Sequence, residues 1–135
     1  MLSFLFEKSK NYKNICLCDI LFIITNRKEV PLHNKYILQE KNFILTDNDE
    51  DYNWLEIMSP TEEELKSLLS KFNLPRDYVF DVSDPYELPR TEGLEDDVPN
   101  LFILSYPIKI SNYQYITRSL AIIIEKEKVI TICKV

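Results

Sequence analysis

The chain has 135 residues, of which 45% are hydrophobic and 28% charged, the composition of one ordinary globular domain. Its only glycine is Gly93, which excludes nucleotide enzymes built on a G-x-x-x-x-G-K loop or a G-x-G-x-x-G turn. The net charge is −6, and residues 47–97 hold 16 acids against 4 bases, a balance that argues against nucleic acid and favours metal cations, basic proteins or simply a solvated face.

The most apolar stretch is residues 15–24, and it predicts a buried strand. It is about half as long as the roughly 20 residues of a membrane helix, and no small-residue cleavage pattern of a signal peptide follows it. Cys16 and Cys18 would lie on one face of this strand, but they lack the four ligands of a structural zinc site. With Cys133 the cysteine count is odd, which indicates a reducing compartment rather than a disulfide framework.

Residues 36–45 and 54–58 are predicted to be strands, each rich in aromatic and branched side chains. Between them, residues 47–51 must form a loop, because four carboxylates with no apolar neighbour cannot enter a core.

A helix is predicted to follow, with Ser59 as N-cap, Pro60 at its first position and Glu62 completing a capping box. Asn73 would close this helix and Pro75 would prevent its continuation. Its apolar side chains recur at helical spacing and form one stripe: Leu65, Leu68, Leu69 and Phe72.

The second half of the chain predicts a short helix over residues 75–82, an acidic loop over 91–100, and strands over 100–110, 115–124 and 128–135, the last two forming a hairpin. Near-continuous branched runs in these last strands indicate that both faces are covered. We therefore expect a single α/β domain over residues 1–135, with a mixed sheet sandwiched between helices. Since the final strand reaches the last residue, we also expect the sequence to be part of a longer protein.

No enzyme site is predicted. His33 is the only histidine, so any Ser-His-Asp or Cys-His arrangement would have to use it, yet it lies in a polar stretch without a nearby nucleophile. Carboxylate pairs of the glycosidase type remain open by residue type alone, although a domain this small offers little depth for a sugar cleft. We expect Trp54 to lie in the core, and Tyr106, Tyr113 and Tyr115 to be strand aromatics.

Residues 54–133 resemble the cytosolic amino-terminal domain of CorA-type magnesium transporters through three motifs in the same order. The first is Trp54 followed by S-P-T-E-E-E-L at residues 59–65, similar to the family's tryptophan strand and "PTEEE" helix start. The second is D-V-S-D-P-Y-E-L-P-R-T-E at 81–92, similar to D-x-L-D-x-x-E-R-P-R-x-E. The third, residues 119–133, is similar to the family's P-L-x-I-I-I … I-I-T-I hairpin. Residues 1–35 are not covered, and 36–53 only loosely.

The resemblance implies a regulatory and assembly domain of a divalent metal ion transporter, for magnesium or cobalt. The full-length protein would be a homopentamer with long stalk helices and two carboxyl-terminal membrane helices bearing a Gly-Met-Asn signature. This domain would be soluble and would lie at the cytoplasmic face of the cell membrane. The alternative from a different class is a free-standing protein-interaction module of the same fold, with a basic partner for residues 47–97.

The resemblance also implies two metal residues, Asp81 and Asp84. In the family, an acidic residue matching Asp81 faces an aspartate of a neighbouring subunit's stalk and helps to bind regulatory magnesium weakly. One or two carboxylates suit Mg²⁺, which prefers hard oxygen ligands and keeps several waters. Some members carry a Glu-Asp pair where this chain has Phe80 before Asp81.

Structural interpretations of the same motif stand beside the metal role. Asp84 precedes a proline and is typical of a turn or cap residue. Arg90 is expected to form an ion pair with Glu87 or Glu92 that fixes the loop, and Leu88 replaces an arginine of the family motif.

Overall fold

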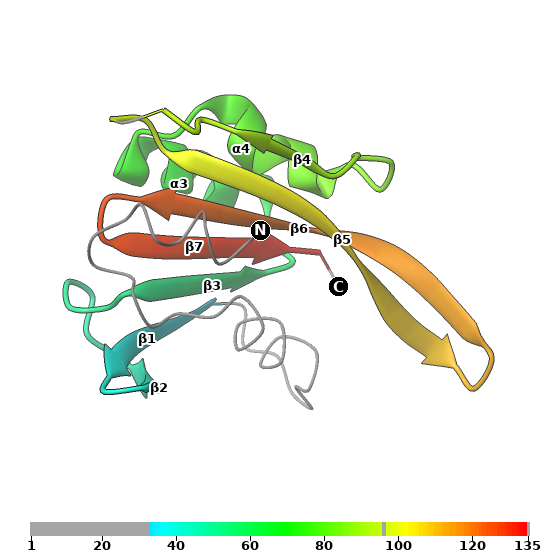
Figure 1. The fold of residues 1–135 in the computed structure, drawn as a ribbon, viewed down its shortest axis with the longest axis horizontal. Helices are drawn as coiled ribbons and strands as arrows, with labels where there is room; N and C mark the ends of the chain where they lie inside the picture. Colours follow the sequence, from blue (N-terminus) through cyan, green and yellow to red (C-terminus); the bar gives the residue numbers. More distant parts are fainter. Residues whose placement is uncertain (1–32, 96, 135) are drawn as a thin grey trace.

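The computed structural model describes residues 33–95 and 97–134 (Figure 1). The predicted strand over residues 15–24, with Cys16 and Cys18, lies outside them. In chain order the elements are β1 (His33–Gln39), β2 (Asn42–Thr46), β3 (Trp54–Met58), α3 (Glu62–Phe72), α4 (Arg76–Phe80), η1 (Asp81–Ser83), β4 (Arg90–Glu92), β5 (Asn100–Ser111), β6 (Gln114–Glu125) and β7 (Lys128–Cys133).

All seven strands belong to one sheet in the order β2-β1-β3-β7-β6-β5-β4. Strands β3 and β7 pair in parallel, with Ile57 opposite Ile132, and the other five pairs are antiparallel. The mixed sheet predicted from the sequence is therefore confirmed, as is the β6–β7 hairpin. This hairpin turns at Lys126, whose φ is 51°.

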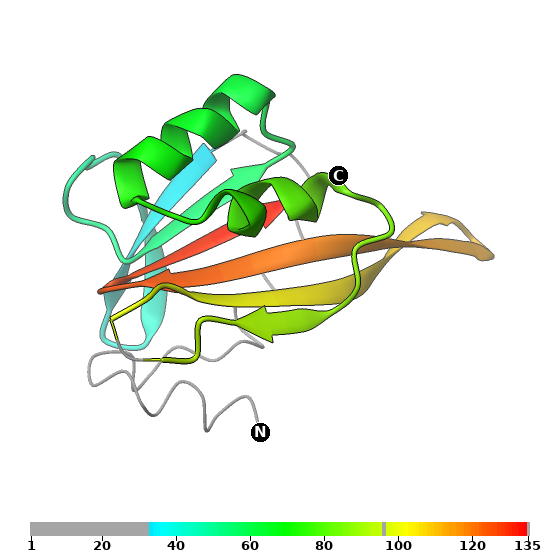
Figure 2. The same cartoon turned by 90° about the horizontal axis from the view of Figure 1, so that it is seen from above.

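Apolar side chains cover both faces of the sheet, because the branched runs of β6 and β7 alternate between two clusters. Ala121, Ile123, Ile130 and Ile132 pack under the helices with Leu65, Leu68 and Phe72. On the opposite face, Trp54 and Phe102 form a second cluster with Leu120, Ile122, Ile124 and Val129. Both described helices, α3 and α4, lie on the first face only (Figure 2). A second helical layer thus stays a prediction.

The predicted strand over residues 36–45 is wrong, because this segment is a hairpin of β1 and β2. Gln39 pairs with Asn42, and the two-residue turn between them places Glu40 at a φ of 55°. Tight hairpin turns of this kind favour Gly, Asn or Asp at positive φ. The sequence carries Glu40 and Lys41 there, so no local signal marks the turn.

Helix α3 begins two residues later than its sequence pattern suggests. Thr61 is the N-cap and Glu64 the N3 residue: the Glu64 backbone N–H donates to Thr61 Oγ1, and Glu64 accepts from the Thr61 backbone N–H at 2.7 Å. Ser59 instead has a φ of 47°. Thr61 and Glu64 repeat the S/T-x-x-E spacing, so the segment holds two overlapping capping boxes and the chain uses the second. Asn73 closes the helix in the left-handed conformation, as predicted.

The capping box makes helix stability depend on pH. The Thr61 N–H, then His33 and the Thr61 hydroxyl, lower the pKa of Glu64 from 4.5 to about 2. A depressed carboxyl pKa contributes stability that is complete above about pH 5 and is lost as the pH falls towards 2. We therefore expect Glu64→Gln to destabilise the chain at pH 6 and to become equal to wild type near pH 2, in urea titrations across that range. Glu63→Gln, which leaves the capping box intact, is the matched control; an equal pH profile for both variants would contradict the assignment.

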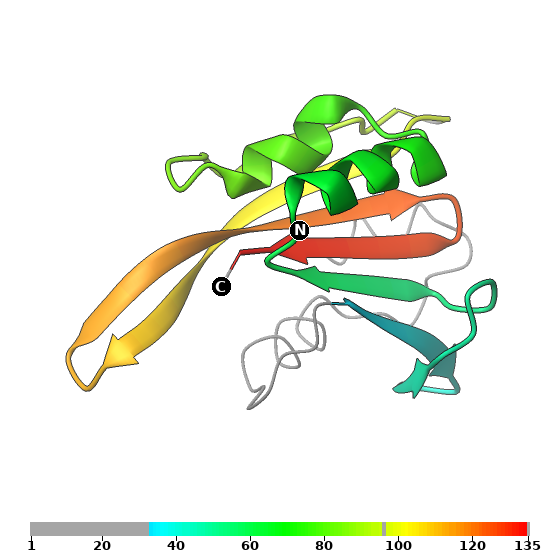
Figure 3. The same cartoon turned by 180° about the vertical axis from the view of Figure 1, so that it is seen from behind.

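The distal halves of β5 and β6 leave the sheet as a two-stranded arm (Figures 1 and 3). Ile110 and Tyr115 are exposed on this arm, and Tyr113 lies in the turn at its tip with 96% of its surface accessible. Tyr113 is therefore not a strand residue, whereas Tyr106 is buried in β5 as expected. No helix in the described part of the chain has the length and hydropathy needed to span a bilayer.

Candidate cation site around Asp81

Asp81 lies at the turn that ends α4 and begins η1. Its backbone N–H donates to the carbonyl of Asp77, and the neighbouring Val79 and Val82 are buried against the sheet. These apolar anchors hold the turn in place while the Asp81 side chain remains 39% exposed. The preceding residue is Phe80, whose ring packs under the Arg76 guanidinium with 4.5 Å between the ring centroid and Arg76 Cζ. The position is thus rigid on one side and open to solvent on the other.

The carboxylate of Asp81 accepts a hydrogen bond from Arg90, whose Nη2 lies 2.8 Å from its Oδ2. Arg90 also contacts Glu92, with 2.6 Å between Nε and Oε1, and its Nη1 contacts Glu87. Each nitrogen of one guanidinium therefore meets a different carboxylate. Hydrogen bonds to charged partners of this kind are short and directional. We call Asp81, Glu87, Arg90 and Glu92 the Arg90 cluster.

The predicted ion pair of Arg90 is confirmed with both Glu87 and Glu92, and the structure adds Asp81 as a third partner. Sequence reasoning missed this contact because Asp81 and Arg90 are nine residues apart across a turn-rich segment with no regular period. Glu92, followed by Asp81, raises the pKa of Arg90, so the guanidinium stays charged at any accessible pH. Three carboxylates around one cation leave the Arg90 cluster with a formal charge of −2.

Asp84 makes a local turn, as its structural interpretation predicted. Its Oδ1 accepts from the backbone N–H of Tyr86 at 2.9 Å, the pattern of an Asx turn. Asp84 also lines a cavity of about 300 Å³ together with Arg118 and Lys134. The positive charges of these two residues oppose a metal cation at that point. The backbone N–H of Asp84 donates to the Asp81 carbonyl at 2.9 Å, while the two side chains have different partners: Arg90 for Asp81 and the Tyr86 backbone for Asp84.

Gly93 directly follows the Arg90 cluster, and the backbone around it shows why this position requires glycine. Its φ is 68°, and a Cβ atom at this position would lie closer than 3.0 Å to the carbonyl oxygen of Pro99 and the hydroxyl of Tyr78. The Asn100 side-chain amide also donates to the Gly93 carbonyl. The glycine thus allows the loop to pass close to α4, which positions β4 and with it Arg90.

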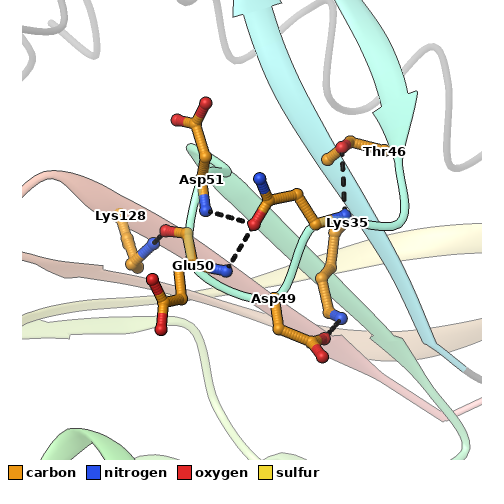
Figure 4. Close-up of polar contacts among 7 residues, drawn as sticks. Lys35, Thr46, Asp49, Glu50, Asp51 and Lys128 are labelled. Carbon is orange, nitrogen blue, oxygen red and sulfur yellow. Dashed lines mark hydrogen bonds and ion pairs between the residues drawn. The ribbon is translucent and has the colours of Figure 1, made fainter.

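The acidic loop over residues 47–51 is organised by its own amide and by two lysines (Figure 4). Asn48 Oδ1 accepts from the backbone N–H groups of Glu50 and Asp51, at 2.9 and 3.1 Å. Lys35 contacts Asp49 and lowers the pKa of that carboxyl group. From β7, Lys128 donates to the carbonyl oxygen of Glu50 and lies over the Tyr52 ring. In this network Asp49 contributes its carboxylate, whereas Glu50 and Asp51 contribute backbone groups, so Asn48 and the two lysines hold the loop.

The other acids of the middle segment are likewise dispersed. Glu56 is fully buried and accepts from the Tyr36 hydroxyl at 3.1 Å, and Glu64 serves the α3 cap while it contacts His33 at 2.8 Å. His33 is exposed at the start of β1, as expected. Within residues 33–95 and 97–134, no group of three or more His, Cys, Asp or Glu side chains is arranged to hold a metal ion. A cation at Asp81 would consequently need ligands from water or from a second chain.

A family model described as "CorA-like Mg2+ transporter protein" matches residues 49–134. The chain is also similar to the complete structure of the CorA magnesium transporter from Methanocaldococcus jannaschii, with 26% identity and a TM-score of 0.56. That match covers 77% of this chain and 32% of the transporter. The structure of the soluble domain of CorA from the same organism matches at 28% identity and a TM-score of 0.52, over 74% of this chain and 38% of that one. No curated protein sequence matches.

Proposed function

The chain belongs to the CorA-like Mg²⁺ transporter family, and on this premise we propose that it is the cytosolic regulatory and assembly domain of a divalent-cation transporter. The observation that carries the proposal is the family match over residues 49–134, which contains β3, both helices, the Arg90 cluster and the β6–β7 hairpin. The chain spans 32% of the complete transporter it resembles. Transport itself would therefore require parts of a longer protein.

In this role the domain would lie at the cytoplasmic face of the membrane and assemble as a homopentamer. The cation would be magnesium, with cobalt as a second candidate. Helices on the second face of the sheet would complete the expected sandwich, since that face also carries an apolar cluster.

The regulatory cation would bind at Asp81, between neighbouring copies of the domain. The donor chemistry fits, because Asp81 offers a hard, partly exposed carboxylate, and Glu92 of the same cluster is 42% exposed. A single copy supplies too few ligands for tight binding, so water and a neighbour's carboxylate would complete the shell. Occupancy would then depend on subunit packing, because the cation relieves repulsion between facing carboxylates.

We expect the isolated chain to bind Mg²⁺ weakly, with a dissociation constant of about 1 mM or higher, and Asp81→Asn to remove most of this binding. The measurement is an amide NMR titration with MgCl₂, which reports shifts residue by residue. Asp49→Asn is the matched control, since Asp49 is likewise an exposed aspartate paired with a basic side chain, Lys35. Shifts concentrated at residues 47–51 and unchanged by Asp81→Asn would contradict the site.

The gene downstream of codon 135 offers an independent test of the transporter assignment. A long helical region followed by two apolar spans of about 20 residues each would support it. A stop codon directly after Val135 would contradict it and favour the interaction module.

One observation favours that alternative, a free-standing protein-interaction module. The β5–β6 arm exposes Ile110 (55%), Tyr113 (96%) and Tyr115 (63%), and exposed apolar and aromatic side chains are common at binding surfaces. The module would recruit a partner through the arm and a basic surface through the acidic residues 47–97. Size-exclusion chromatography with a candidate partner, before and after Tyr115→Ser, would test it; co-elution lost in that variant would support the alternative.

A further inference from the structure

The Arg90 guanidinium already serves as the positively charged partner of Asp81, which is the role that a metal cation at Asp81 would take. Asp81 Oδ2 accepts a hydrogen bond from Arg90 Nη2 at 2.8 Å, so one of its two carboxylate oxygens is engaged with a positive side chain. Arg90 is 26% exposed, less than Asp81 at 39%. The Asp81 side chain therefore stays partly accessible to a cation from solvent while it is paired with Arg90.

We propose that Arg90 and a divalent cation compete for Asp81, so that Arg90 is a tethered counter-cation that sets the concentration at which the site fills. This inference rests on the proposed function, because it concerns the regulation of the same carboxylate. It explains why a carboxylate at an exposed turn would bind only at high cation concentration: the cation must displace a charged hydrogen bond rather than bare water.

The arrangement of the Arg90 cluster makes such an exchange feasible. If Arg90 releases Asp81, its Nε and Nη1 still contact Glu92 and Glu87, so the guanidinium is not left unpaired. A buried charge without a partner would make release costly, but two remaining carboxylates avoid that cost. The three acids are spread around the guanidinium and not gathered at one point. A cation that takes the place of Arg90 at Asp81 would therefore be held partly through water, as Mg²⁺ commonly is.

A purely structural role for Arg90 makes different predictions. In that case its removal would only loosen the loop between η1 and β4, and added salt would act through ionic strength alone. Competition instead predicts a gain in divalent binding when Arg90 is removed, and this gain must depend on Asp81.

The test measures Mn²⁺ binding to the 135-residue chain by electron paramagnetic resonance, in which bound Mn²⁺ no longer contributes to the free-ion signal. We expect Arg90→Gln to bind Mn²⁺ roughly tenfold more tightly than wild type, because a positive charge within hydrogen-bonding distance of the ligand has gone. The double variant Arg90→Gln/Asp81→Asn should lose this gain. Arg90→Lys, which keeps the charge without the fork of donors, should stay near wild type. Lys66→Gln, which removes the exposed Lys66–Glu62 pair on α3, is the matched control and should change nothing.

Thermal unfolding gives a second readout. Arg90→Gln should lower the melting temperature by roughly 5 °C, and MgCl₂ should restore it, whereas NaCl at equal ionic strength should not. Equal rescue by NaCl, or equal Mn²⁺ affinity with and without Arg90, would overturn the competition between Arg90 and the cation. The proposed site would still stand in that case, provided that Mn²⁺ binding depended on Asp81. Failure of the proposed site would look different: Asp81→Asn would leave Mn²⁺ binding unchanged in both the wild-type and the Arg90→Gln chain.

Discussion

Trp54→Ala is expected to lower the free energy of unfolding by about 3–5 kcal/mol, a large share of the stability of a domain of this size. Trp54 is fully buried, and its ring stacks on Tyr36 with the centroids 4.5 Å apart and meets the edge of Phe43 at 5.2 Å. Its indole Nε1–H donates to Thr131 Oγ1 at 2.9 Å. One side chain thereby joins the β1–β2 hairpin to β3 and β7, and its loss would leave a cavity between them.

Urea unfolding followed by far-ultraviolet circular dichroism measures this loss, because Trp54 is the only tryptophan and the variant has no comparable fluorescence. Thr131→Val separates packing from hydrogen bonding. It keeps the shape but leaves the buried indole N–H unsatisfied, and it should cost about 1–3 kcal/mol. A Trp54→Ala loss no greater than that of Thr131→Val would show that the ring does not hold the hairpin to the sheet.

Gly93→Ala is expected to cost about 2–4 kcal/mol, although it adds only a methyl group. The cost combines a left-handed backbone, disfavoured for residues with a Cβ atom, with a clash against the Pro99 carbonyl and the Tyr78 hydroxyl. The Pro99 atom belongs to the backbone and cannot rotate away. We therefore expect the loop to shift, and β4 and the Arg90 cluster to loosen with it.

Two comparisons assign the cause of the Gly93 effect, both by thermal or urea unfolding. Asparagine adopts the left-handed conformation more readily than alanine. An equal loss of stability in Gly93→Asn and Gly93→Ala would therefore identify crowding as the main cause. Lys126→Gly, at a φ of 51° in the exposed β6–β7 turn, should change stability by less than about 1 kcal/mol. A Gly93→Ala chain as stable as wild type would contradict the close approach of the loop to α4.

Local patterns predicted the elements whose signals are contained within a few residues. The apolar stripe of α3, its closure at Asn73, the short helix after Pro75 and the β6–β7 hairpin are all confirmed. Errors arose where the local sequence fits two solutions or carries no signal for the observed one. The capping box could begin at Ser59 or Thr61, and the structure uses Thr61. The turn at Glu40 was invisible because a glutamate adopts a conformation that usually signals glycine or asparagine.

The candidate site was only partly visible in the sequence. Arg90 pairing with Glu87 or Glu92 follows from their closeness along the chain, and Asp84 before a proline is a recognisable turn former. The contact between Asp81 and Arg90 could not be read in the same way, since it depends on how α4 and β4 are placed on the sheet. That placement relies on the close approach at Gly93, which is a tertiary feature.

The amino-acid sequence by itself determined the α/β class, the family, the helix α3 and the strands with branched runs, because each depends on the periodicity, the composition or the motifs of neighbouring residues. Tertiary structure alone decided which carboxylates meet a basic side chain that is distant along the chain. Lys35 meets Asp49 and Arg90 meets Asp81 across strands and turns, and the energy of these contacts depends on distance in space. The number of charged residues can be read from the sequence, but which of them interact depends on the distances between them in the folded chain.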